Sequence, residues 1–146
     1  MKIRQLSLFI ENKPGQLVAP CRTLADHGIN ILTLSLADTE KYGILRLVVD
    51  DWERANEILA SRGFVVNVVE VLALEVGDHP GGLADLLALL DETGANIEYM
   101  YAFTYGRGGR AVMIFRFEDP DRAIAALGER GVQALDAIDL GRRAGG

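Results

Sequence analysis

Two short turn motifs contain the residues of this sequence that are best suited to bind a small molecule. Residues 12–17 are Asn-Lys-Pro-Gly-Gln-Leu, and residues 78–83 are Asp-His-Pro-Gly-Gly-Leu. In each motif a polar side chain precedes a Pro-Gly turn, and an apolar helical pattern follows it. The unpaired N–H groups at the start of a helix bind carboxylates, and glycine lets a ligand approach them without a Cβ in the way.

A free amino acid carries an ammonium group beside its carboxylate, so its binding site also needs acceptors. Asp78 offers a carboxylate, whereas Asn12 offers an amide oxygen. Asn30 and Asn96, each 18 residues further along the chain, offer two more amide oxygens. Because a charge-assisted hydrogen bond is the stronger kind, we expect a site that uses Asp78 to bind more tightly than one that uses Asn12.

The same residues also have a purely structural interpretation. Asn or Asp before Pro-Gly is an ordinary turn and cap signal, and an Asn after a helix-ending Gly can simply complete a turn. His79 is either a ligand contact or an exposed loop residue. It has no second His nearer than His27 and no neighbouring Cys, so no metal site is expected. Asp50, Asp51 and Asp119 are predicted to cap helices, so no catalytic carboxylate pair is expected.

The two motifs belong to an internal repeat that determines the predicted domain organisation. Gly-x-Asn-Ile occurs at 28–31 and again at 94–97, and residues 43–55 align with residues 111–123 after a two-residue insertion. Such a repeat is typical of a small domain copied in tandem. We therefore expect one domain at 1–69, a second at 70–140, and a flexible C-terminal tail at 141–146.

Hydrophobic periodicity predicts the same order of elements in each copy. In the first copy we expect strands at 2–10, 29–37, 43–49 and 64–69, and helices starting near Gln16 and over 52–62. In the second copy we expect strands at 70–76, 96–104, 110–118 and 132–139, and helices starting near Leu83 and at Pro120. The order βαββαβ, present twice, predicts an α+β fold of two ferredoxin-like domains, each an antiparallel sheet with helices on one face.

Several of the predicted strands are apolar on both faces, most clearly those at 43–49 and 110–118. A sheet with helices on one side is polar on the other side unless something covers it. We therefore expect the second face to be covered by the sister domain or by another chain. Residues 64–76 contain no Gly, Pro or Ser linker, so the two domains are expected to be closely coupled.

Composition excludes several classes of function. The 146 residues carry a net charge of −6 with no basic cluster before the tail, which argues against nucleic-acid binding. The longest apolar run is too short to cross a membrane, and the N-terminal residues follow a strand pattern and not a signal-peptide pattern. Cys21 is the single cysteine and cannot form an internal disulfide, so a cytoplasmic location is expected.

The motif x-Pro-Gly-x-Leu, followed by an amphipathic helix, Gly-x-Asn-Ile and two further strands around a helix, resembles the ACT domain. The resemblance covers about residues 1–140 and occurs twice at matched spacing, as in small stand-alone proteins made of two ACT units. The stretch 96–103, Asn-Ile-Glu-Tyr-Met-Tyr-Ala-Phe, is also similar to that subgroup. ACT domains are regulatory modules that bind small molecules, most often amino acids. The resemblance implies a ligand held between two units, with the Pro-Gly loop of one unit facing the strand Asn of the other.

Some amino-acid-binding members have a His two residues before the loop Asn. Ile10 and Val76 occupy those positions here, so the ligand of those members does not carry over. Chemistry and resemblance together predict ligand-binding sites made by Asn12, Pro14, Gly15, Gln16, Leu17, Asn30, Ile31, Asp78, His79, Gly81, Gly82, Leu83, Asn96, Ile97 and Tyr99.

The sequence thus predicts a non-catalytic regulatory protein, with no cofactor, that binds a free amino acid as its effector. Its expected protein partner is a second copy of itself or a metabolic enzyme. One alternative is a ligand-independent interaction module for a metabolic enzyme, in which the two pockets are vestigial. Another is a small enzyme on the same fold, such as an acyl phosphate hydrolase. That activity needs an arginine in the phosphate-binding loop, and neither Pro-Gly loop contains one.

Overall fold

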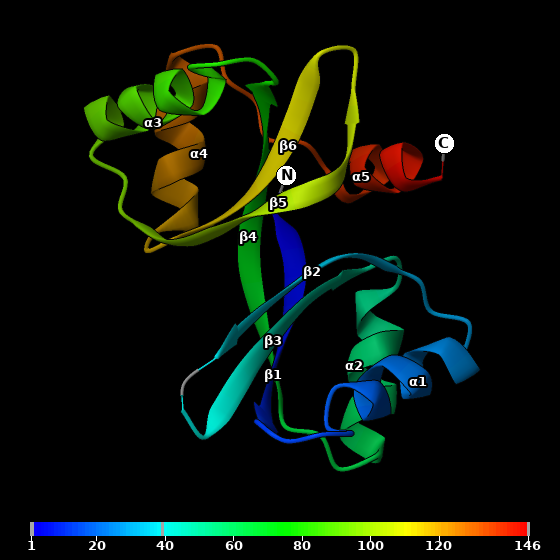
Figure 1. Ribbon diagram of the computed structural model, residues 1–146. Coiled ribbons are helices and arrows are strands. Elements are labelled where there is room, and N and C mark those ends of the chain that lie inside the picture. The colour runs from blue at the N-terminus through cyan, green and yellow to red at the C-terminus, as the bar shows by residue number, and fades with distance from the viewer. Residues whose placement is uncertain (1, 39, 146) are drawn as a thin grey trace. The chain divides into compact units, whose positions relative to one another are not determined.

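Figure 1 shows a computed structural model of the chain, which describes residues 2–38 and 40–145. The described chain divides into two compact units. The first unit comprises residues 4–69, and the second unit comprises residues 70–145 together with residues 2 and 3. Within the described residues, no helix combines the length and the apolar character needed to cross a bilayer.

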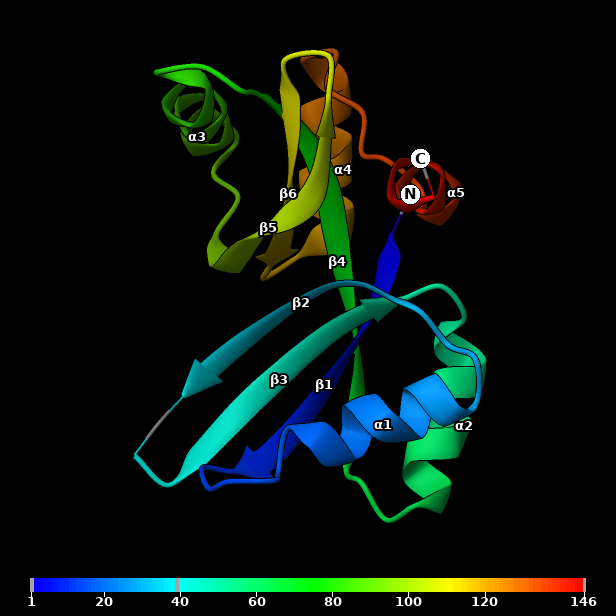
Figure 2. The same ribbon diagram turned by 45° about the vertical axis from the view of Figure 1, so that its right-hand side comes forward.

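The first unit contains most of β1 (Ile3–Glu11), α1 (Val18–Asp26), β2 (Ile31–Asp38), β3 (Tyr42–Val49), α2 (Trp52–Ser61) and the start of β4 (Val66–Gly77). Its strand order is β2-β3-β1-β4, and β3 pairs antiparallel with both β1 and β2. Figure 2 shows α1 and α2 together on one face of this sheet. The apolar side chains of that face form a core that includes Leu6, Leu8, Leu24, Leu45, Leu47 and Leu59.

The second unit contains the rest of β4, α3 (Gly82–Thr93), β5 (Ile97–Arg107), β6 (Arg110–Phe117), α4 (Pro120–Glu129) and α5 (Ala137–Ala144). Its strand order is β4-β6-β5, and β6 pairs antiparallel with both neighbours. The core beneath α3 and α4 includes Leu72, Leu74, Leu90, Phe115, Phe117 and Leu127. The prediction of an α+β fold with two ferredoxin-like units is confirmed. The strands predicted at 64–69 and 70–76 form one strand, β4.

The C-terminal region differs from the sequence-based expectation. In place of a strand at 132–139, Leu135 makes a single bridge to Ala73, and α5 follows. The tail predicted to be flexible from residue 141 is helical as far as Ala144. The reason is local: the Asp136 side chain accepts a hydrogen bond from the Asp139 N–H at 2.8 Å, and the Asp139 side chain accepts one from the Asp136 N–H at 3.1 Å. This reciprocal capping box starts a helix where the apolar spacing alone indicated a strand.

Helix α5 packs on the face of the second unit's sheet opposite to α3 and α4 (Figure 1). On that face Glu75 lies opposite Val112, which in turn lies opposite Phe103. Arg143 of α5 donates to Glu75 at 2.5 Å, and Leu140 is fully buried. We expected the sister domain or another chain to cover this face. In the second unit the chain's own last helix covers part of it.

Residues 2 and 3 belong to the second unit, where two carboxylates bind Lys2. Its ammonium lies 2.9 Å from Asp121 and 3.0 Å from Glu70. These hydrogen bonds, with Asp121 first, raise the pKa of Lys2. Lys2 is thereby held within the second unit, whereas β1 from Arg4 onward belongs to the first unit.

Candidate functional site

The first Pro-Gly loop is exposed and lies beside the hairpin that joins β2 to β3. The Asn12 N–H donates to the Lys41 carbonyl at 3.0 Å, and Gly15 has φ +88°. A Cβ at Gly15 would meet no atom within 4 Å, so glycine is required there by its backbone conformation and not by lack of space. The loop runs into α1, where Leu17 stands at the N-cap and supplies no side-chain hydrogen bond.

The second Pro-Gly loop has the same backbone plan but is packed more tightly. The Asp78 N–H donates to the Gly109 carbonyl at 2.8 Å, and Gly81, with φ +90°, stands at the N-cap of α3. A Cβ at Gly82 would lie only 1.9 Å from the Gly77 carbonyl oxygen. A Cβ at Gly77 would lie 2.5 Å from the His79 ring. Gly77 is not among the residues predicted from the sequence to form the site, although the first repeat has Glu11 at the equivalent position.

The helices that follow the Pro-Gly loops begin without a side-chain cap, unlike the other helices of the described chain. Asp51 accepts from the Arg54 N–H at 3.2 Å, Asp119 accepts from the Arg122 N–H at 3.1 Å, and Asp136 caps α5. The predicted caps at Asp51 and Asp119 are confirmed. Within the described residues, the N-cap residues Leu17 and Gly81 supply no such side-chain bond to α1 and α3, and the Gly82 N–H donates to the His79 carbonyl at 3.0 Å.

The two strand asparagines lie just before β2 and β5 and are exposed. The backbone of Asn30 makes two hydrogen bonds to Asp50. Its N–H donates to the side-chain Oδ1 at 3.1 Å, and its carbonyl accepts from the Asp50 N–H at 3.2 Å. Asn96 is held differently. Its carbonyl accepts from the Glu118 N–H at 3.0 Å, and its side-chain Nδ2 donates to Glu118 Oε2 at 3.2 Å.

Within each unit, the loop and the asparagine lie at opposite ends of the sheet. In the first unit, Glu11 pairs with Tyr42 at one end of β3, and Ile31 pairs with Val49 at the other. Eight residues of extended strand span roughly 23 Å, so Asn12 and Asn30 are much too far apart to contact one amino acid together. The second unit repeats this separation, because Gly77 pairs with Arg110 and Ile97 pairs with Phe117.

The remaining predicted site residues fall into three groups. Ile31 and Ile97 pack against the hydrophobic cores of their units, and Leu83 is half-buried on α3. Pro14, Gln16 and Leu17 accompany the first loop, and Leu17 is 43% exposed. A register shift after Ile97 places Tyr99 opposite Arg116, which lies on the sheet face away from the α3 and α4 core.

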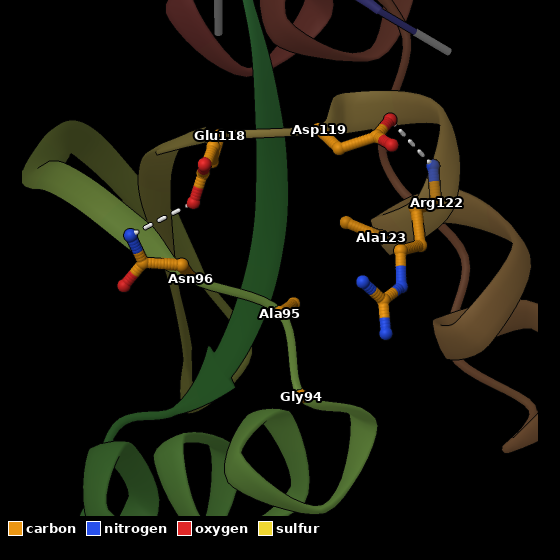
Figure 3. A pocket seen from close by; sticks show the side chains of 7 residues that line it. All are labelled: Gly94, Ala95, Asn96, Glu118, Asp119, Arg122 and Ala123. Carbon is orange, nitrogen blue, oxygen red and sulfur yellow. Dashed lines mark hydrogen bonds between the residues drawn. The ribbon is translucent and has the colours of Figure 1, made fainter.

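A pocket of about 220 Å³ lies beside Asn96, at the end of the second unit where α3 leads into β5 and β6 leads into α4 (Figure 3). Glu118 and Arg122 line opposite sides of it: the Glu118 carboxylate is turned toward Asn96, and the Arg122 guanidinium extends toward Gly94. Neither Glu118 nor Arg122 is among the residues predicted from the sequence to bind a ligand. The described residues contain no cluster of three or more His, Cys, Asp or Glu side chains that could hold a metal ion.

The doubled fold agrees with a comparison against protein families. A family model described as an ACT domain pair matches residues 1–142. The chain belongs to the ACT domain pair family. A search of curated proteins gives no match.

Solved structures support the assignment of the fold. Protein BT0572 from Bacteroides thetaiotaomicron is 37% identical, with a TM-score of 0.88 and 96% coverage of each chain. The regulatory subunit of aspartate kinase from Thermus thermophilus, in its ligand-free form, is 22% identical, with a TM-score of 0.60 and coverage of 86% of this chain and 91% of that chain. The corresponding regulatory subunit from Thermus flavus is also 22% identical, with a TM-score of 0.55 and coverage of 86% and 90%. The ACT pair thus shares its fold with regulatory subunits.

Proposed function

We propose that this ACT pair is a non-catalytic regulator that binds a free amino acid between two ACT units. In the proposal, the Pro-Gly loop of one unit holds the ligand's carboxylate and ammonium groups, and the strand asparagine of another unit completes the site. The observation that carries the proposal is that α1 and α3 begin without a side-chain cap, while the other described helices have an aspartate cap.

The chemistry of the loops suits a zwitterion. Free N–H groups at a helix N-terminus, aided by the helix dipole, attract a carboxylate. Gly15 and Gly81 leave open space where a side chain would otherwise stand. Asp78 and Asn12, which directly precede these turns, are exposed and supply acceptors for the ammonium group.

The separation of loop and asparagine within one unit supports a site shared by two units. Since roughly 23 Å of strand divides them, a ligand that contacts both must take the loop from one unit and the asparagine from another. We propose that the loop at 12–16 works with Asn96 and the loop at 78–82 works with Asn30. A ligand that binds one arrangement of the units better than others shifts the population toward that arrangement, and regulation needs no more than this.

The proposal is tested by thermal unfolding of the full chain against each of the twenty amino acids. A ligand present at 100 times its Kd stabilises the folded state by about 2.7 kcal/mol, which shifts Tm by several degrees for a chain of this size. Isothermal titration calorimetry then gives the affinity and the number of sites. If none of the twenty raises Tm and none gives a binding isotherm, the proposal is wrong.

One observation favours the alternative of a ligand-independent interaction module. On strand β2, Leu34 is 49% exposed and Leu36 is 46% exposed. Exposed apolar residues on an edge strand are suited to contact a partner. Sedimentation of the wild type and a Leu34→Lys variant, each with and without amino acids, distinguishes the two functions. Association that depends on Leu34 but not on any amino acid favours the interaction module.

The proposal also retains a cytoplasmic location, on the sequence argument that the single cysteine has no internal disulfide partner. Burial raises the pKa of the Cys21 thiol, as expected for a packed cysteine and not for a reactive one. The expected protein partner is a second copy of the chain or a metabolic enzyme.

A further inference from the structure

The pocket beside Asn96 contains an unused donor and an oriented acceptor. Within the described residues, the guanidinium of Arg122 has no hydrogen bond or ion pair, and it reaches to 3.8 Å from the position of a Cβ on Gly94 (Figure 3). On the opposite side, Glu118 is oriented by the hydrogen bond from Asn96 Nδ2. Ala95 and Ala123 add apolar surface between these two charged side chains, and Asp119, the third charged residue of the lining, accepts from the Arg122 backbone N–H.

The internal repeat shows where the residues that line this pocket differ between the two units. The residues that line it are Gly94, Ala95, Asn96, Glu118, Asp119, Arg122 and Ala123. Their counterparts in the first unit are Gly28, Ile29, Asn30, Asp50, Asp51, Arg54 and Ala55. Only two of these positions differ between the units, where Ala95 replaces Ile29 and Glu118 replaces Asp50.

Each difference changes one property of the site: the first reduces side-chain volume, and the second lengthens the acidic side chain. Ile29 is 6% exposed and belongs to the core of the first unit, whereas Ala95 is smaller by three carbon atoms. Asp50 accepts from the backbone N–H of Asn30, so its carboxylate is held against the chain. The longer Glu118 reaches the asparagine side chain and stands at the wall of the pocket.

We propose that this pocket is a specificity subsite for the side chain of the bound amino acid, and that it selects a carboxamide over the corresponding carboxylate. This inference rests on the proposed function, in which the loop of another unit holds the ligand's carboxylate and ammonium groups. The side chain is then the part of the ligand left to enter the pocket beside Asn96. A carboxamide presents an acceptor to Arg122 and a donor to Glu118 at once.

A carboxylate side chain satisfies only half of this arrangement. Its oxygens accept from Arg122, but they also meet Glu118, which has the same charge and no proton to share. The volume of about 220 Å³ is several times the roughly 30 Å³ that one water occupies in the liquid, so it has room for the end of an asparagine or glutamine side chain.

The test compares isosteric ligands by calorimetry on the full chain. The probes are L-glutamine with L-glutamate, L-asparagine with L-aspartate, and glycine, which has no side chain to enter the pocket. We expect whichever amide binds more tightly to have at least about tenfold higher affinity than its corresponding acid. The acid loses a hydrogen bond to a charged group and gains a repulsion. Glu118→Gln is expected to raise the affinity for the acid relative to the amide.

Two variants separate the pocket from the rest of the site. Ala95→Ile copies the first unit's residue into the second unit, and we expect it to reduce the amide preference to less than twofold while glycine binds as before. Arg122→Gln, at an exposed position, is expected to have the same effect without altering the core. Arg54→Gln makes the matched change in the first unit and is expected to keep the preference.

The outcomes distinguish a failure of the subsite inference from a failure of the proposed function. If amino acids bind but amide and acid bind equally, or if Ala95→Ile and Arg122→Gln both keep the preference, the subsite inference is wrong and the proposed function stands. If no probe binds and none of the twenty amino acids raises Tm, the proposed function itself fails. Loss of the amide preference in either pocket variant, with Arg54→Gln unchanged, supports the subsite.

Discussion

Gly82→Ala is expected to destabilise the chain because it places a carbon against the backbone of the preceding strand. The new Cβ would lie 1.9 Å from the Gly77 carbonyl oxygen and 3.2 Å from the Gly77 Cα. Relief requires a shift of roughly 1.5 Å to reach van der Waals contact, and the obstacle is main chain that cannot change rotamer. We estimate about 3 kcal/mol for this overpacking, offset by up to 1 kcal/mol from the lower entropy of the unfolded chain. The net loss is about 2 kcal/mol.

The assay is urea unfolding followed by circular dichroism, with Gly128→Ala as the matched control. Gly128 lies in α4, and a Cβ there would meet no atom within 4 Å. Its φ, like that of Gly82, is not positive, so the chemical change is the same and only the surroundings differ. The control is expected to gain about 0.5–1 kcal/mol from helix propensity. Equal stabilities for the two variants, or a Gly82→Ala protein as stable as the wild type, would refute the steric argument.

Three further predictions concern the ligand and the last helix. With the amino acid that stabilises the chain most, Asp78→Ala is expected to cost tenfold or more in calorimetric affinity and Asn12→Ala only about fivefold, because only Asp78 offers a charged acceptor; equal losses would contradict this ranking. Leu140→Ala is expected to cost about 2–5 kcal/mol in urea unfolding because this side chain of α5 is fully buried; a loss under 1 kcal/mol would show that α5 is loosely packed. The pKa of Asp136 is lowered from 3.8, first by the hydrogen bond from the Asp139 N–H, so its cap stabilises α5 above that pH and is lost as the pH falls through the folded-state pKa. The stability difference between wild type and Asp136→Ala is therefore expected to be present at pH 7 and to shrink below pH 4, and a difference that grows on acidification would reverse the assigned sign.

The sequence alone determined those features that depend on local chemistry and on the repeat. Alternating and helical periodicities predicted the strands and helices from β1 to α4 to within a few residues. Asp51 and Asp119 cap the helices where their sequence position predicts, because capping involves only residues three apart. The doubled motif also predicted the ACT family, because an element order repeated at matched spacing is far more specific than either copy alone.

The structure corrected the sequence-based prediction where two signals competed over a short stretch. Around residues 132–139 the apolar spacing favoured a strand, but the Asp136 capping box favours a helix, and the buried face available to Leu140 decides for the helix. A single sequence does not show which face of the sheet is vacant. For the same reason it could not predict that the last helix of the chain would cover that face.

In the candidate site, too, some features were predicted from the sequence and others were shown only by the structure. Residue types alone led to the prediction that the loops at 12–17 and 78–83 and the asparagines at 30 and 96 bind a ligand. Their capacity to form hydrogen bonds depends on the type of residue. Only the folded sheet shows that a loop and an asparagine of one unit lie at opposite ends of the same strands, because strand register fixes that distance. Only the packed structure shows a pocket lined by Ala95, Glu118 and Arg122, since a cavity depends on every neighbour that fails to fill it.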